Sequence, residues 1–123
     1  MQLHPQEIEV WYVLPAIRRA VCKGLVAKGL TQRATAKLLG ITEPAVSQYI
    51  RSKRATKLRF SQEMGKLIDD VCSRIASGKI SAYAGIQQLA AAYRHSGCMC
   101  VLHKKLDKVP PCCEKGLSSI CRD

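Results

Sequence analysis

The chain has 123 residues, which is enough to bury one sizeable hydrophobic core. Aromatic residues make up only 5% of it, a composition that favours packed helices over a sheet, and the formal net charge of +11 favours a negatively charged partner. Residues 1–10 lack the basic-then-apolar pattern of a secretion signal, and the early apolar run 10–14 stops at Pro15. We therefore expect neither a secretion signal nor a membrane span, and a cytoplasmic protein.

Two helices are expected before residue 30. A short one would cover residues 6–14, and a longer one would begin at Pro15, because proline is favoured in the first turn of a helix. The longer helix would run to about Lys28 and end at Gly29. Its apolar side would carry Ile17, Val21 and Leu25.

Residues 31–51 predict two short helices joined by a tight turn. Thr31 is placed to cap the first helix and Thr42 to cap the second, each by accepting a free backbone N–H. Gly40 stands where the first helix ends and the backbone needs a positive φ. Pro44 falls in the first turn of the second helix, where a missing N–H costs nothing. This order of cap, glycine turn, cap and proline is typical of a helix-turn-helix.

Each of these helices has a predicted apolar side. It consists of Ala36, Leu38 and Leu39 in the first helix and of Val46, Tyr49 and Ile50 in the second, with Ile41 at the corner between them. Ala36 is small enough for the second helix to cross close by. The opposite side of the second helix carries short or hydrogen-bonding groups suited to reading base edges in a major groove: Glu43, Ala45, Ser47, Gln48 and Arg51.

The stretch resembles the DNA-reading unit of the lambda-repressor-like (XRE-type) regulators. The residues that carry the resemblance are Gln32, Ala36, Gly40, Val46 and Ile50. It implies a bundle of about five helices around that unit and double-stranded DNA as the partner. An ordinary helical hairpin with a glycine turn is the alternative, but the agreement of caps, turn and apolar sides favours DNA binding.

The charge distribution supports the same interpretation. Between Arg18 and Arg59 there are eleven basic residues and one acid, Glu43, so this stretch holds +10 of the net +11. Such a stripe is typical of phosphate binding, whereas a membrane-surface helix would need large apolar residues opposite the charges. The predicted DNA-contacting residues are Gln32, Arg33, Thr42, Glu43, Ala45, Ser47, Gln48, Arg51, Lys53 and Arg54.

Two more helices are expected after the basic connector 51–59. Ser61 would cap the first, which stops at Gly78, and Ser81 would cap the second. The second would run to about His95. Their inward sides would carry Met64, Leu67, Ile68, Val71, Cys72 and Ile75, and then Ile86, Leu89, Ala90 and Tyr93.

The expected fold class is therefore all-α, a helix-turn-helix bundle of about five to six helices with an irregular cysteine-rich C-terminal segment. We expect a DNA-binding domain with an N-terminal helix over 1–59, a helical hairpin suited to dimerisation over 60–96, and a metal-binding tail over 97–123. A homodimer is expected because one helix-turn-helix covers too little groove for useful specificity. One candidate surface for the dimer contact is the apolar segment with Trp11, Val13 and Leu14, and the other is the last helix, which ends near Tyr93.

The tail indicates a metal. It has few apolar residues and cannot build a core, so metal binding is the expected source of its folding free energy. Cys98 and Cys100 point to one side of an extended chain, while adjacent Cys112 and Cys113 point apart. The candidate ligands are the five cysteines of the last 26 residues, Cys98, Cys100, Cys112, Cys113 and Cys121, with His103 as a possible substitute.

The kind of metal centre follows less directly from the spacing. Structural zinc usually uses two Cys-x-x-Cys pairs, and this chain contains none. An iron–sulfur cluster accepts irregular spacings if four thiolates converge, and disulfides or free thiols are a further alternative. Cys22 and Cys72 lie in predicted helices, where a lone cysteine is most often a small core residue. Cys72 stays open as a further metal ligand, because the C-terminal segment could fold back onto its helix.

The whole arrangement is also similar to small predicted archaeal regulators with a cysteine-rich C-terminus. Their Cys-x-Leu-His pattern corresponds to Cys100, Leu102 and His103 here, where the sequence is Cys-Val-Leu-His. The resemblance also implies a second cysteine close to Cys72, and this chain has none there.

Together these features predict a dimeric DNA-binding transcription regulator whose C-terminal cysteines hold an iron–sulfur cluster that senses redox state or iron. A DNA-binding regulator with a structural zinc is the first alternative. A thiol-dependent enzyme is a weaker one, because the sequence shows no paired histidine and cysteine in a structured segment, no glycine-rich phosphate loop and no convergent carboxylates. A protein-interaction module would leave the basic stripe unexplained. We therefore do not expect an enzyme.

Overall fold

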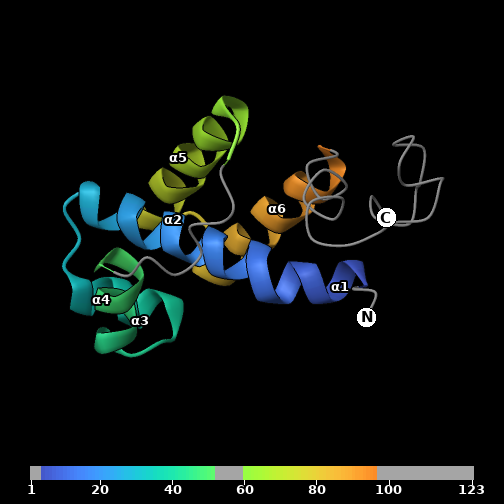
Figure 1. Ribbon diagram of the computed structural model, residues 1–123. Coiled ribbons are helices and arrows are strands. Elements are labelled where there is room, and N and C mark those ends of the chain that lie inside the picture. Colours follow the sequence, from blue (N-terminus) through green and yellow to red (C-terminus); the bar gives the residue numbers. More distant parts are fainter. Residues whose placement is uncertain (1–3, 52–59, 97–123) are drawn as a thin grey trace.

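The computed structural model describes residues 4–51 and 60–96, and every regular element within these two stretches is helical. The predicted all-α fold is thus confirmed. Figure 1 shows the helices gathered around one long N-terminal rod. The elements are α1 (Pro5–Ile8), the π-helical turn η1 (Glu9–Val13), α2 (Leu14–Ala27), α3 (Gln32–Leu39), α4 (Glu43–Arg51), α5 (Gln62–Ala76) and α6 (Ala82–His95).

The N-terminal rod is continuous, so the expected break before Pro15 is wrong. The residue at the junction, Leu14, is helical, and its N–H donates to the carbonyl of Glu9, which is a π-helical bond. Pro15 has no N–H to donate and its ring crowds the carbonyl of Trp11, one turn earlier. A wider π turn directly before proline relieves this crowding, and the helix continues.

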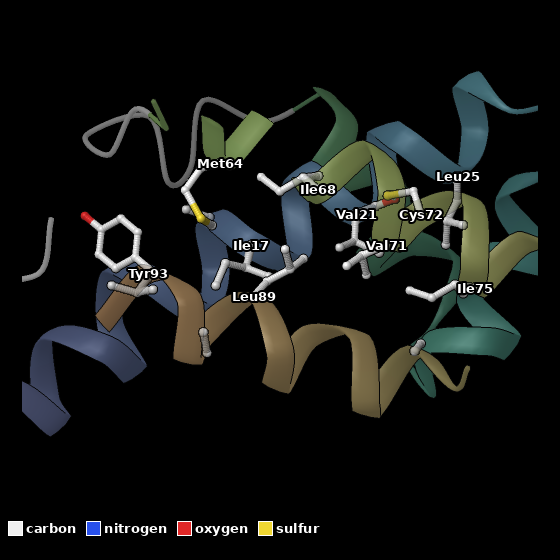
Figure 2. Packing of buried hydrophobic residues seen from close by; sticks show 14 of the residues in the cluster. Ile17, Val21, Leu25, Met64, Ile68, Val71, Cys72, Ile75, Leu89 and Tyr93 are labelled. Carbon is white, nitrogen blue, oxygen red and sulfur yellow. The ribbon is translucent and has the colours of Figure 1, made fainter. Parts of the chain in front are cut away.

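The main core fills the space between α2, α5 and α6 (Figure 2). The predicted apolar sides of these three helices point into it, with Ile17 and Val21 facing Val71 and Leu89. The predicted Leu67 and Ile86 pack against this core half-buried. The buried residues are Ile8, Val13, Ala16, Ile17, Val21, Leu25, Met64, Ile68, Val71, Cys72, Ile75, Ala82, Leu89, Ala90 and Tyr93.

Two glycines let the helices of this core approach closely. A Cβ atom at Gly24 of α2 would lie 2.5 Å from Cys72 Sγ of α5. A Cβ atom at Gly85 of α6 would lie 2.8 Å from side-chain atoms of both Val71 and Ile75. Since such distances are shorter than van der Waals contact, the absence of a side chain at these positions sets the helix separation.

The predicted caps of α5 and α6 are confirmed. Ser61 Oγ accepts the N–H of Met64 at 3.2 Å, and Ser81 Oγ accepts the N–H of Ala84 at 3.1 Å. The expected division at residue 59 stays a prediction, although residues on both sides of it contribute to one buried cluster. Among the described residues, the structure contains no helix with the length and apolar character needed to cross a membrane.

Candidate DNA-binding surface

Helix α3 begins at the cap expected from the sequence. Thr31 Oγ1 accepts the N–H of Ala34 at 3.0 Å. Thr35, which the sequence analysis did not single out, is fully buried, and its hydroxyl donates to the Thr31 carbonyl at 2.9 Å. A threonine one turn after a cap is the signal for this bond, because a helical hydroxyl reaches back four residues. The two threonines together fix the start of the helix.

The turn between the helices is closed by Gly40, whose φ is 68°. The N–H of Gly40 donates to the Lys37 carbonyl at 3.4 Å, and the N–H of Ile41 donates to the Ala36 carbonyl at 3.1 Å. Paired bonds of this kind end a helix and need a left-handed residue, which glycine adopts without a Cβ penalty. The predicted glycine turn is confirmed.

Helix α4 starts as predicted. Thr42 Oγ1 accepts the N–H of Ala45 at 3.2 Å, and the Thr42 carbonyl accepts the N–H of Val46 at 3.2 Å. Pro44 lies in the first turn, where no helical N–H bond is lost.

A second, smaller cluster seats these helices on α2. Its buried members are Cys22, Ala36 and Val46, and Leu39, Ile41, Tyr49 and Ile50 pack against it half-buried. The predicted close crossing at Ala36 agrees with this burial. Leu38, which we expected on the apolar side of α3, is instead 44% exposed. Position 38 lies next to the buried side of α3 but is not part of it. Thr35 is buried on that side instead.

The outward side of α4 carries most of the expected base-reading groups. Glu43, Gln48 and Arg51 are exposed, and Ser47 is half-buried beside them. Positions 43, 47 and 51 recur at intervals of four residues, and position 48 lies three residues before 51, so the four side chains share one broad side of the helix. Ala45 is half-buried. The arrangement presents one long amide, one carboxylate and one guanidinium along a single helix face.

The first turn of α3 adds two more of the predicted contacts. Arg33 is exposed and Gln32 is half-buried. Thr42, which also caps α4, is exposed. The last two predicted residues, Lys53 and Arg54, lie outside the described residues.

Most cations of the basic stripe that the structure describes form no ion pair with a described acid. Lys28 pairs with Asp69 of α5 at 3.1 Å. No ion pair with an acid in the described part of the chain forms at Arg18, Arg19, Lys23, Arg33, Lys37 or Arg51. Unpaired cations of this kind are available to neutralise phosphates.

The two described cysteines are core residues, as expected. Burial raises the pKa of the Cys22 thiol to about 11, and Cys72 adds to that rise. The Cys72 thiol also has its pKa raised to about 11, mainly by burial. Within residues 4–51 and 60–96, no three potential ligand side chains gather to hold a metal ion. The predicted ligands Cys98, Cys100, His103, Cys112, Cys113 and Cys121 lie outside the described residues.

The apolar residues expected in a dimer contact divide into two groups. Val13 and Tyr93 are buried in the main core and Leu14 is half-buried, so they have little surface to offer. Trp11 is 53% exposed, and its neighbour Val10 is 57% exposed. Among the described residues at this end, the large exposed apolar side chains are therefore those of Val10 and Trp11.

Comparison with known proteins bears on the same segment. Searches among curated proteins and among solved structures found no match. Residues 23–69 match the model of a protein family described as helix-turn-helix, over less than half of the chain. The match includes α3, α4 and their caps. It supports the assignment of this segment as the helix-turn-helix of a DNA-binding transcription regulator.

Proposed function

We propose that the protein is a sequence-specific DNA-binding transcription regulator and that α4 is its recognition helix. The supporting observation is the outward face of α4, which carries Glu43, Gln48 and Arg51 while Val46 anchors the opposite side. Two capped helices and a glycine turn hold this face in a fixed orientation. A rigid support is what base recognition requires, because hydrogen bonds to base edges tolerate little displacement.

In this proposal different residues supply specificity and affinity. The Gln48 amide is suited to bidentate contact with adenine, and Glu43 is suited to accept from the cytosine amino group. Cations without acidic partners, such as Arg33 and Lys23, would contact phosphates and contribute affinity without sequence information.

The test begins with a cognate sequence selected from random duplex DNA by the full-length protein. Replacing Gln48 by alanine is expected to weaken binding to that sequence by about 1–3 kcal/mol and to leave non-specific binding unchanged. Arg33→Gln should weaken binding to all sequences and reduce the salt dependence. Lys66→Gln, an exposed charge change on α5, is the matched control. Unchanged cognate affinity in the Gln48 variant would exclude α4 as the reader.

We also propose a homodimer, whose contact includes Val10 and Trp11. Two half-sites would then give the specificity that one helix-turn-helix lacks, on a pseudo-palindromic operator. Trp11→Glu should lower the molar mass measured by light scattering from that of a dimer to that of a monomer, whereas Tyr83→Glu should not. A monomeric parent protein at micromolar concentration, with and without DNA, would remove this proposal.

The C-terminal cysteines are proposed to hold an iron–sulfur cluster that senses redox state or iron. The support is their number and spacing: Cys98 and Cys100 flank one residue, and the chain contains no Cys-x-x-Cys pair of the kind zinc prefers. Oxidation or loss of iron would alter such a cluster, and this change would in turn alter the affinity of the regulator for DNA.

Anaerobic purification followed by absorption spectroscopy and metal analysis tests this assignment. Iron with acid-labile sulfide supports the cluster, whereas colourless protein with about one zinc per chain supports the structural alternative. Cys98→Ser, Cys100→Ser and Cys121→Ser should each lose the metal. Cys22→Ala is the control that should retain it, because Cys22 is buried under the helix-turn-helix. Equal metal content in parent and tail variants would contradict both metal assignments.

A further inference from the structure

A pocket of about 330 Å³ lies where α2, the end of α3 and the start of α6 meet. Its lining includes Arg18 from α2, Lys37 and Leu38 from α3, and Tyr83 and Ile86 from α6. None of the outward residues of α4 contributes to it. We propose that this pocket binds a small organic anion, namely a carboxylate on an apolar body of about one ring, which goes beyond the DNA-binding function proposed above.

The apolar part of the proposal rests on large side chains that the fold leaves uncovered. Leu38 is 44% exposed and Tyr83 is 75% exposed, and both line the pocket, with half-buried Ile86 between their helices. Apolar side chains on two walls of one hollow are typical of ligand sites. The volume is at the low end of the range for small-molecule pockets, roughly 300–1,000 Å³, which sets the size of the body.

The charge of the lining selects an anion. Arg18 and Lys37 are its ionised residues, and no acid that the structure describes lines the pocket. Neither cation makes an ion pair with a described acid, so both charges are available to a ligand. A carboxylate between them would form charge-assisted hydrogen bonds.

The backbone around the pocket reinforces this preference. Ala82 and Tyr83 are the first two residues of α6 and line the pocket, so the pocket lies beside the helix N-terminus, which carries a partial positive charge. At the end of α3, the carbonyls of Ala36 and Lys37 already accept the N–H groups of Ile41 and Gly40. These hydrogen bonds reduce the partial negative charge at the end of α3, so the cationic side chains dominate the electrostatic potential of the pocket.

DNA phosphate does not account for these features. A phosphate would engage Arg18 or Lys37 but would leave the apolar walls at Leu38 and Tyr83 in water. A ligand that combines an acid with an apolar body uses both.

The test uses two probes that share one body, 4-phenylbutyrate and 4-phenyl-1-butanol, titrated into the ¹⁵N-labelled full-length protein. The carboxylate is expected to shift the amide signals of Gly40, Tyr83 and Ile86 saturably and to bind about two- to fivefold more tightly than the alcohol. Lys37→Gln and Arg18→Gln should each remove most of that difference. Lys66→Gln, with the same charge change on α5, should not. Leu38→Ser should weaken both probes by about threefold, because it removes part of the apolar wall.

Three outcomes would overturn the proposal. They are shifts that do not saturate at the pocket residues, equal affinity for the acid and the alcohol, or an equal loss in the Lys66 and Lys37 variants. Each readout is independent of DNA, so a failure here leaves the proposed regulator function untouched, and loss of DNA binding leaves the pocket untouched.

Discussion

The two buried clusters on either side of α2 differ greatly in size. Among the described residues, the main core between α2, α5 and α6 has fifteen buried members, whereas the cluster under the helix-turn-helix has three. One of those three, Cys22, comes from α2 itself. A cluster this small buries too little apolar surface to stabilise two short helices alone. We infer that the helix-turn-helix depends on α2 for its position and on the main core for its stability.

Helix α2 joins the two clusters through adjacent residues. Val21 is fully buried in the main core, and the next residue, Cys22, is fully buried under the helix-turn-helix. The thiol of Cys72 on α5 lies 3.8 Å from the Val21 carbonyl, so α5 contacts α2 where the two clusters meet. A change in the main core should therefore affect the whole protein, whereas a change in the small cluster should act mainly on DNA binding.

The largest expected effect comes from the main core. Leu89 is fully buried between α6 and α2, and Leu89→Ala would remove its packing and leave a cavity. We expect a loss of about 2–5 kcal/mol in the free energy of unfolding, measured by urea denaturation. Tyr83→Ala, on the exposed side of the same helix, is the control and should change little. A loss below about 1 kcal/mol in the Leu89 variant would show that the core tolerates the cavity.

The matching change in the small cluster is Val46→Ala on α4. Val46 is fully buried, but fewer residues surround it, so we expect a loss of about 1–3 kcal/mol in unfolding free energy. Because Val46 anchors the recognition face, the affinity for cognate DNA should fall as well. Leu89→Ala, assayed where it is fully folded, should keep its DNA affinity. If both variants lost DNA affinity equally, the two clusters would not have separate roles in stability and DNA binding.

The contrast between the clusters also explains what the sequence predicted well. The caps at Thr31 and Thr42 and the turn at Gly40 involve residues that are close together in the chain, so their chemistry is visible in the sequence. The exposure of Leu38 depends on which residues of α3 pack against α2 and α4. Contacts between residues far apart in the chain decide this, and the local sequence does not show them. The continuity through Pro15 depends on a π turn for which the sequence has no distinct signal.

The functional residues divide in the same way. The outward face of α4 followed from helical spacing, since Val46 had to face inward and Gln48 therefore outward. The pocket beside Leu38 did not, because its walls come from α2, α3 and α6 and only the fold brings them together. Trp11 and Val13 could not be distinguished in the sequence, although one is half-exposed and the other is buried.

The buried thiols predict a pH dependence at the junction of the clusters. Burial disfavours the thiolate and raises the pKa of Cys72 from its ordinary value of 9.0 to about 11 in the folded protein. Thiolate then forms first in the unfolded chain, so stability is lost as the pH rises from about 9 towards 11. Between pH 8 and 10, we expect Cys72→Ala to lose about 1 kcal/mol less stability than the parent in urea denaturation. Identical pH dependence in both proteins would contradict a protonated buried thiol.

The smallest effects should come from the caps, and they compare the two regions most directly. Thr31 and Ser81 each accept one backbone N–H at the start of a helix, at 3.0 and 3.1 Å. Replacing either residue by alanine should lower the stability of the folded protein by about 0.5–1 kcal/mol, because one backbone N–H would then hydrogen-bond to water and no longer to the hydroxyl. Ser81→Ala should appear in the free energy of global unfolding, because α6 belongs to the main core. Thr31→Ala should in addition give faster hydrogen exchange of the α3 amides and weaker DNA binding, because local opening of the small cluster costs less than global unfolding. Faster exchange of the α3 amides in the Ser81 variant, to the same degree as in the Thr31 variant, would show that the two regions open together.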